Sequence, residues 1–270
     1  MPSISVIIST YNKPHFLEKV LTGYCFQTFK NFEIIIADDG SSSKTKEMIK
    51  KFERLISQKI YHVWHEDNGF RKCKILNKAI QKSSNEYLIF TDGDCIPDKK
   101  FVENHSRLSR KGCFLSGGHF PLNEKISNEI KLDDIKSQKC FSPKFIFSKG
   151  QPFGKDFLKL TNNYLLSKAL DIITLTRKTF NGNNSSAWRE DIIFSNGFDE
   201  RMGYGSEDNE LGFRLVNNNI KPIQVRNRIP LLHLFHERPY KSRQEMIRNK
   251  SFAKSTIEKK KIKTKFGIYR

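Results

Sequence analysis

Short apolar runs alternate with amphipathic segments through the first hundred residues. The apolar runs end in turn-forming residues and predict buried strands over 4–8, 33–37, 60–64 and 87–91. Between them, apolar residues at helical spacing predict a helix that begins near Pro14 and further helices over 45–56 and 71–81. This β-α-β-α order predicts an α/β fold with a mostly parallel sheet of the nucleotide-binding type.

The pattern is less regular in the second half of the chain. A helix over 98–109 and a strand over 113–116 are predicted first. From 121 to 155 the chain is polar, rich in lysine and interrupted by prolines and glycines, which predicts a long excursion or a flexible lid. Beyond it we expect a helix over 157–176, loops over 180–191 and 198–208 that each lead into a helix, and an apolar strand over 229–232.

Composition favours a folded, strongly cationic protein. The chain has 270 residues, 37% of them hydrophobic, which is enough for one large α/β domain, alone or with an appendage. The formal net charge of +19 predicts anionic partners. About half of this excess lies in residues 237–270, where twelve Lys or Arg residues stand against three Glu. This basic helical extension could bind phosphates of nucleic acid or an anionic membrane surface, or it could be a solvated helix.

The five cysteines are widely separated and form no C-x-x-C pair, so we expect reduced thiols and no zinc site. The N-terminus runs directly into a strand without a signal-peptide pattern, and no segment is apolar for long enough to span a membrane. These features predict a protein that is cytoplasmic or is peripheral on the inner face of the membrane.

Two carboxylates, Asp92 and Asp94, follow the predicted strand over 87–91. Side chains two residues apart in an extended chain point the same way, and ligands of α/β sheets bind at the carboxyl ends of strands. Paired carboxylates suit a hard cation such as Mg²⁺ or Mn²⁺ that is shared with a diphosphate, although a solvated turn can have the same sequence. Asp39 also ends a strand, where it can bind a base or ribose or can cap the next helix.

Other candidate residues lie at predicted helix starts and at a strand end. Arg71 opens a helix, where a guanidinium suits a diphosphate; a surface arginine is the alternative. Glu207 and Asp208 begin another helix, where acidic residues are also plain capping residues. His233 and His236 follow an apolar strand and are possible metal ligands, or else ordinary core or surface histidines.

Taken in order along the chain, these motifs resemble those of family 2 glycosyltransferases of the GT-A fold. The resemblance rests on the strand and loop over 4–12, Asp38-Asp39-Gly40-Ser41, Asp92-Gly93-Asp94 and the run from Phe198-Asp199-Glu200 to Gly205-Ser206-Glu207-Asp208. Its second half resembles the galactosyltransferase and chondroitin-polymerase branch. The resemblance covers residues 3 to 240, but the segment 121–155 matches no motif.

The resemblance implies a domain organisation and an activity. It implies a GT-A domain over 1–236, with a nucleotide-binding half over 1–120, a variable excursion or lid over 121–155 and an acceptor and catalytic half over 156–236. Residues 237–270 would form the basic extension. The activity implied is inverting, metal-dependent transfer of a hexose or N-acetylhexosamine from a UDP-sugar to a hydroxyl of a glycan or lipid-linked glycan, in bacterial surface polysaccharide or lipopolysaccharide synthesis.

The resemblance also implies residue roles. Asp208 would be the general base, and Mn²⁺ or Mg²⁺ would be held by Asp94 with His236 and His233. The acceptor would be bound by Glu207, Asn184 and Trp188. The UDP-sugar would be bound by Thr10, Tyr11, Asn12, Asp39, Arg71 and Asp92.

Two other classes of protein compete with this interpretation. A nucleic-acid-binding protein would explain the positive charge, but the chain lacks an aromatic RNA-binding signature or a zinc finger, so no nucleic acid is expected as a partner. A nucleotidyltransferase on a related sheet would need a glycine-rich loop after the first strand, and residues 9–14 contain no glycine.

Overall fold

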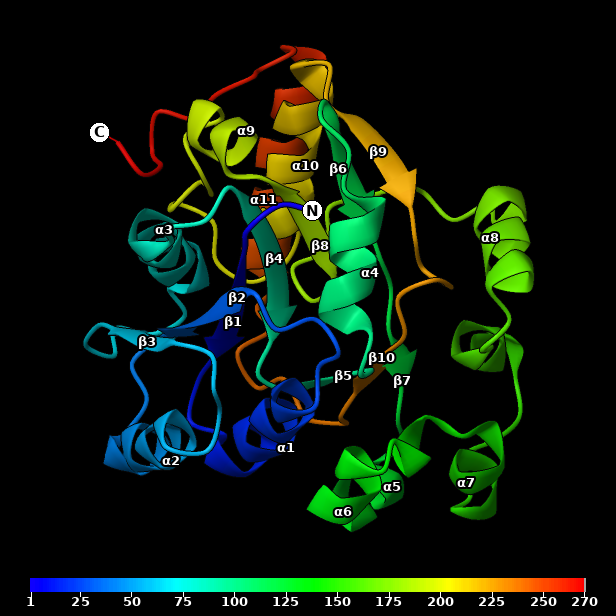
Figure 1. Ribbon diagram of the computed structural model, residues 1–270. Coiled ribbons are helices and arrows are strands. Elements are labelled where there is room, and N and C mark those ends of the chain that lie inside the picture. The colour runs from blue at the N-terminus through cyan, green and yellow to red at the C-terminus, as the bar shows by residue number, and fades with distance from the viewer. Residues whose placement is uncertain (270) are drawn as a thin grey trace.

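The computed structural model describes residues 1–269 and contains two β-sheets flanked by helices (Figure 1). The larger sheet has seven strands in the order β3-β2-β1-β4-β8-β6-β9. Its first four strands are parallel, whereas β8 runs antiparallel to β4 and β6. A smaller sheet has the order β5-β10-β7. The expected α/β fold with a mostly parallel sheet is confirmed.

The N-terminal half follows the predicted alternation of strands and helices. The elements are β1 (Ile4–Thr10), α1 (Pro14–Cys25), β2 (Phe32–Asp38), α2 (Ser43–Glu53), β3 (Ile60–Trp64), α3 (Lys72–Lys82) and β4 (Tyr87–Asp92). Each expected strand and helix is present, with ends displaced by a few residues at most.

The large sheet is buried on both faces. Along β1, Val6 and Ile8 belong to the apolar core that includes α1, whereas Ile7 belongs to the core that includes α3. Successive side chains of a strand point to opposite faces, so a continuous apolar run is what a strand with two covered faces requires. This explains why these strands are visible in the sequence as apolar runs.

The second half of the large sheet contains two strands that the sequence pattern missed. The expected α4 (Phe101–Leu108) and β6 (Cys113–Ser116) are present, as are α9 (Arg189–Phe194) and α10 (Glu207–Asn217). However, the predicted loop over 180–191 contains β8 (Ser185–Trp188), and β9 (Lys221–Gln224) adds the edge strand beside β6.

Residues 121–155, which we expected to form a long excursion or a flexible lid, contain short helices. They contain α5 (Glu124–Glu129), α6 (Leu132–Lys136), the 3₁₀ turn η1 (Lys139–Phe141) and α7 (Pro143–Ser148). Ile126, Ile135 and Ile146 from these short helices are fully buried in the core that includes α1. The single helix expected over 157–176 is divided into η2 (Lys155–Leu160) and α8 (Tyr164–Ile173).

The small sheet joins segments that are far apart in the sequence. Its strands are β5 (Cys95–Pro97), β7 (Phe120–Pro121) and β10 (Leu231–His233). β10 runs antiparallel to β5 and parallel to β7, and it pairs His233 with Cys95. This pairing brings the late histidines to the end of β4.

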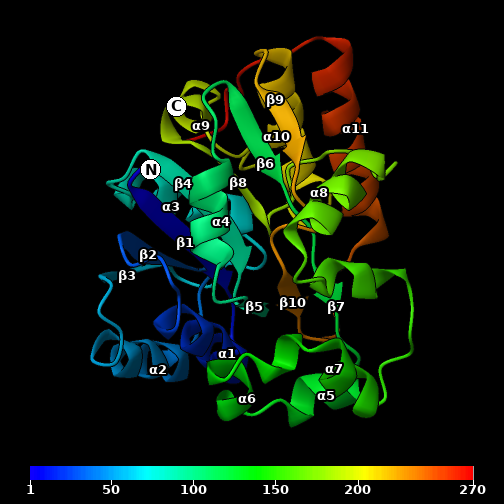
Figure 2. The same ribbon diagram turned by 45° about the vertical axis from the view of Figure 1, so that its right-hand side comes forward.

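The C-terminal extension is helical, as expected, and it packs against the rest of the molecule. Helix α11 (Arg243–Glu258) contacts α10 and buries Asn249, Ala253 and Thr256 (Figures 1 and 2). The Asn249 amide donates to the carbonyl oxygens of Gly203 and Tyr204, both at 3.1 Å. Within residues 1–269, no helix combines the length and the apolar character that crossing a bilayer requires.

Candidate active site

A cleft of about 400 Å³ opens at the carboxyl ends of β1 and β4. In the large sheet, β2 lies on one side of β1 and β4 lies on the other. The strand order therefore reverses at β1, and ligands of such sheets usually bind at this point. Ser9 and Asp92 are paired here, and the Ser9 hydroxyl donates to Asp92 Oδ1 at 2.5 Å.

The side of the cleft formed by the N-terminal half is lined by Ser9, Thr10, Tyr11, Lys13, Asp39, Gly69, Phe70, Lys72, Asp92, Gly93 and Asp94. The opposite side is lined by Asn183, Tyr204, Glu207, Asp208, His233, His236, Arg238 and Tyr240.

Asp39 is fixed at one end of the cleft by hydrogen bonds. Its Oδ1 lies 2.7 Å from His65 Nε2, and its Oδ2 accepts from the backbone amide of Arg71 at 2.9 Å. Tyr11 is exposed and donates through its hydroxyl to Asp67 at 2.8 Å. Thr10, Tyr11 and Asp39 all line the cleft, as the predicted nucleotide site requires. His65 was not identified from the sequence because an isolated histidine carries no pattern.

Asn12 is beside the cleft and does not line it. It has a positive φ of 47°, and its backbone amide donates to the Ser41 hydroxyl at 2.8 Å. Its side-chain oxygen accepts from the backbone amide of Ser42 at 2.9 Å. Asn12 therefore connects the loops that follow β1 and β2 and supports the residues that do line the cleft.

Lys72 occupies the place in the cleft that the sequence analysis gave to Arg71. The Arg71 side chain is exposed and is not part of the lining, and only its backbone amide reaches the site. Lys72 Nζ lies 2.7 Å from Asp92 Oδ1. Burial by itself would lower the pKa of Lys72, but the carboxylates of Asp92, Glu207 and Asp208 outweigh it and raise the pKa. Lys72 therefore stays positively charged among the carboxylates of Asp92, Glu207 and Asp208.

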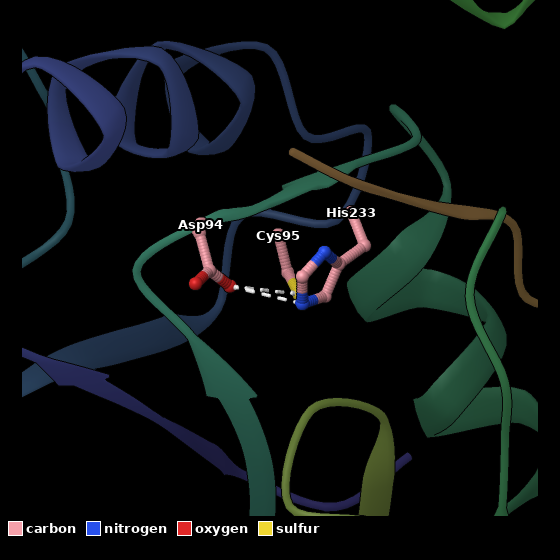
Figure 3. A group of neighbouring side chains, drawn as sticks. All are labelled: Asp94, Cys95 and His233. Carbon is pink, nitrogen blue, oxygen red and sulfur yellow. Dashed lines mark hydrogen bonds and ion pairs between the residues drawn. The ribbon is translucent and has the colours of Figure 1, made fainter. Parts of the chain in front are cut away.

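Asp94 and the two histidines form a group with metal-ligand character. Asp94 Oδ2 lies 2.9 Å from His236 Nε2, and Asp94 Oδ1 lies 3.7 Å from His233 Nε2. Figure 3 shows the Asp94 carboxylate beside the His233 ring; Asp94 directly precedes β5, and His233 lies on the neighbouring strand β10. One carboxylate and two imidazoles fit a divalent ion that accepts oxygen and nitrogen ligands, such as Mn²⁺. Burial opposes ionisation of Asp94, but the hydrogen bond with His236 and the charges around it lower its pKa overall.

Cys95 also lies within reach of this group. A ligand atom from each of Asp94, Cys95 and His233 lies within 4.8 Å of the others (Figure 3). However, burial raises the pKa of the Cys95 thiol well above its usual range. A thiol that stays protonated is a poor metal ligand, so Asp94 and the histidines are the better candidates.

The loop before α10 positions Glu207 and Asp208 on the opposite side of the cleft. Gly205 and Ser206 both have positive φ, 102° and 70°, which turns the Glu207 carboxylate back to accept from the Gly205 amide at 2.7 Å. Left-handed backbone is unfavourable for serine, and such strain often accompanies functional sites. Asp208 Oδ2 accepts from the backbone amide of Gly182 at 2.7 Å.

Both carboxyl groups have a raised affinity for protons. Burial raises the pKa of Glu207 to about 7, with a further contribution from Asp208. Burial likewise raises the pKa of Asp208. A carboxylate with a raised pKa is a better proton acceptor near neutral pH than an ordinary aspartate.

Two predicted acceptor residues do not line the cleft. Asn184 is fully buried, where its amide donates to the Gly118 carbonyl at 2.6 Å and its Oδ1 lies 3.0 Å from His105 Nε2. Trp188 pairs with Tyr87 at the start of β4, whereas Asp92 is at the other end of that strand. The neighbouring Asn183 does line the cleft.

Three aromatic rings, none of them identified from the sequence, gather at the cleft. Phe70, Tyr204 and Tyr240 come from three separate loops, and their ring centroids are 5.0 to 5.9 Å apart. All three line the cleft. Such amphipathic surfaces are common in ligand sites. Arg238 and Tyr240 also extend the cleft wall past residue 236, into the segment that the sequence analysis assigned to the basic extension.

The strand order and the cleft at its reversal point define an α/β protein of the GT-A class. A family model described as glycosyl transferase family 2 matches residues 5–170. The chain therefore belongs to glycosyl transferase family 2, and the predicted family is confirmed.

Individual relatives are similar to the chain in sequence or in fold. Chondroitin synthase of Escherichia coli is 26% identical over 231 residues, which are 78% of this chain and 32% of the relative. S. aureus TarS 1-349 in complex with UDP has a TM-score of 0.61 at 16% identity, and the match covers 93% of this chain and 64% of that one. Mannosyltransferase PcManGT from Pyrobaculum calidifontis, in complex with GDP-Man and Mn²⁺, has a TM-score of 0.58 at 17% identity, with 88% and 59% covered. These similarities confirm the GT-A fold and the resemblance to the chondroitin-polymerase branch, although the chain spans only about a third of the chondroitin synthase.

Proposed function

We propose that the chain transfers a hexose or N-acetylhexosamine from a UDP-sugar to a hydroxyl of a glycan acceptor, with inversion at the anomeric carbon. The observation that carries this proposal is the arrangement of the cleft. Asp94 with His233 and His236 faces Glu207 and Asp208 across one cavity, and Asp39 lies at the nucleotide end. A donor bound between these groups would present its anomeric carbon to an acceptor on the side of Asp208.

The donor would be held mainly by the N-terminal half. Asp39 would accept hydrogen bonds from the uracil or ribose, because its position is fixed by His65 and the Arg71 amide. Asp92, held by Ser9 and Lys72, would face the sugars of the donor. The cations that line the cleft beside these groups include Lys13 and Arg238, which suit the diphosphate better by position than Arg71 does.

Asp94, His233 and His236 would hold Mn²⁺ or Mg²⁺. When bound, the ion would neutralise the negative charge that grows on the UDP diphosphate as the glycosidic bond breaks. Asp208 would accept the proton of the acceptor hydroxyl. At the same time the hydroxyl oxygen of the acceptor would bond to the anomeric carbon, on the face opposite the departing UDP. Glu207 would bind the acceptor, and the rings of Phe70, Tyr204 and Tyr240 would pack against its sugars.

The acceptor would be a glycan or lipid-linked glycan in bacterial surface polysaccharide or lipopolysaccharide synthesis. The similarity to the chondroitin synthase of Escherichia coli supports this setting. We further propose that the protein works in the cytoplasm, where UDP-sugars are made available, at the inner face of the membrane. Donor binding would belong to residues 1–120 and acceptor binding with catalysis to 156–236, completed by Arg238 and Tyr240.

A panel of UDP-sugars tests the proposal, with release of UDP measured in the presence of Mn²⁺ and after its removal by a chelator. At least one donor is expected to be hydrolysed or transferred only with metal. Asp208→Asn keeps an oxygen that can accept from Gly182, so it should still bind UDP while turnover falls by about 100-fold or more. Ordinary turnover by this variant would refute the role of Asp208, and no UDP release from any donor would refute the proposed activity.

A further inference from the structure

Helix α8 (Tyr164–Ile173) attaches to the protein through its polar side. Its buried residues are Ser167 and Asp171. Asp171 Oδ1 accepts from the backbone amide of Asn227 at 2.8 Å, and Asp171 Oδ2 lies 2.7 Å from Arg228 Nε. A surface helix normally buries its apolar face, so this orientation is the reverse of the usual one.

The apolar face of α8 is turned to solvent. At helical spacing, the apolar residues lie on the side opposite Asp171. Leu165 is 76% exposed and Ile172 is 74% exposed. The large aliphatic side chains exposed here are Leu165, Leu166, Ile172 and Ile173 of α8, together with Leu175 just after the helix. α8 lies at the edge of the molecule in Figure 1 and comes to the front in Figure 2. A contiguous apolar surface of this kind marks a site of interaction.

The charges around this face are positive. Between residues 164 and 178 the exposed charged side chains are Lys168, Arg177 and Lys178. The acidic residue in this segment, Asp171, is buried and paired with Arg228. Arg107 from α4 adds a further cation, with its guanidinium 5.9 Å from the centre of the Tyr164 ring.

We propose that α8 docks the protein on an anionic lipid bilayer, with the helix in the plane of the interface. Apolar side chains would enter the boundary between headgroups and acyl chains, and Lys168, Arg177 and Lys178 would meet the anionic headgroups. A second copy of the chain fits this face less well. A two-fold interface would bring the same cations together between two molecules that each carry a net charge of +19.

The docking helix is tied to the segment that leads into the cleft. Asn227 and Arg228, which hold Asp171, precede β10 and its His233. On a bilayer, α8 would therefore hold the acceptor half of the site near the membrane surface. The inference concerns a surface outside the cleft and does not depend on the proposed transferase activity.

Sedimentation with vesicles tests the docking surface. Vesicles of phosphatidylcholine with and without phosphatidylglycerol are the probes, and the fraction of full-length protein bound is the readout. Wild type should bind the anionic vesicles and bind neutral ones weakly. Ile172→Glu should weaken binding to anionic vesicles by about tenfold or more, because a charged side chain cannot enter the apolar boundary. Leu55→Glu is the matched control, since Leu55 is 62% exposed on another part of the surface, and it should change binding by about twofold or less.

Several outcomes would overturn the proposal. They are absence of binding by the wild type, equal binding by wild type and Ile172→Glu, or loss of binding only when Lys259, Lys260 and Lys261 are changed to Gln. A fall in sedimentation mass caused by Ile172→Glu in free solution would identify a second copy as the occupant. Both substituted side chains are exposed, so thermal unfolding should be unchanged and can be checked directly. Release of UDP in solution should also be unchanged, which separates this result from a failure of the transferase proposal.

Discussion

The cleft contains alternating charges that hold one another in place. Lys72 lies 2.7 Å from Asp92 and also raises the ionised fraction of Glu207 and Asp208, because its positive charge lowers both of their pKa values. Without Lys72, Asp92 would lose its ion pair, and the pKa values of Glu207 and Asp208 would be raised further. Lys72 thus limits how far burial raises the pKa values of Glu207 and Asp208.

At the same scale, the two arginines considered for the proposed diphosphate site should behave differently. Arg238 lines the cleft, whereas the Arg71 side chain is exposed outside it. Arg238→Gln removes a charge-assisted contact, so we expect the KM for the UDP-sugar to rise by about tenfold or more. Arg71→Gln keeps the backbone amide that binds Asp39 and should change KM by about twofold or less. Steady-state kinetics with varied donor concentration measure KM for both variants. A larger rise in KM for Arg71→Gln than for Arg238→Gln would show that Arg71 binds the diphosphate.

At the scale of elements, the sequence predicted the strands and helices whose apolar side chains follow a regular pattern. The parallel strands have two covered faces and therefore read as apolar runs. β8 is equally buried, but it contains Ser185 and Ser186, whose hydroxyls have internal partners: the Ser186 hydroxyl lies 2.8 Å from both the Tyr87 hydroxyl and His105 Nδ1. Its polar partners are known only once the chain is folded, so its sequence looks like a loop.

Site residues followed the same rule. Short motifs at strand ends, such as Asp92-Gly93-Asp94, were found because their place in the sheet follows from local sequence. Lys72, His65 and the ring of Tyr240 were missed because only tertiary packing brings them to the cleft. The resemblance implies Asn184, whereas it is the neighbouring Asn183 that lines the cleft, because nothing local distinguishes which of two adjacent amides points inward to the core.

The contact between α10 and α11 depends on a buried ion pair. Arg214 is fully buried and lies 2.8 Å from Glu210, which also accepts from the Thr256 hydroxyl of α11 at 2.8 Å. Arg214→Met would leave the Glu210 carboxylate buried without its cation, so we expect a loss of about 3–5 kcal/mol in the free energy of unfolding. Urea denaturation measures the loss. The double variant Glu210→Met with Arg214→Met should lose less than Arg214→Met alone, and a larger loss would show that packing dominates.

At the scale of the whole molecule, the Glu207 carboxyl makes a contribution to stability that is lost as pH rises. Glu207 has a pKa of about 7 when folded and an ordinary carboxyl pKa of 4.5 as its reference. Between these values the folded state holds more protons at Glu207 than the unfolded state, so the contribution of this group to stability is greatest at low pH and is lost as pH rises through 7. Glu207→Gln keeps an acceptor for the Gly205 amide and should be more stable than wild type at pH 8 by up to about 3 kcal/mol. Thermal unfolding at pH 5 and pH 8 tests this, and parallel curves for the two proteins would contradict it.

The order β5-β10-β7 has a consequence for the newly made chain. β10 is the last of these strands to be synthesised, yet it lies between the other two. While the chain is still on the ribosome, β5 and β7 lack the strand that joins them, and His233 and His236 have not reached Asp94. Strands β1 to β4 can therefore pair before the two histidines proposed as metal ligands have been synthesised. The proposed metal group is therefore completed only after residue 236 has left the ribosome.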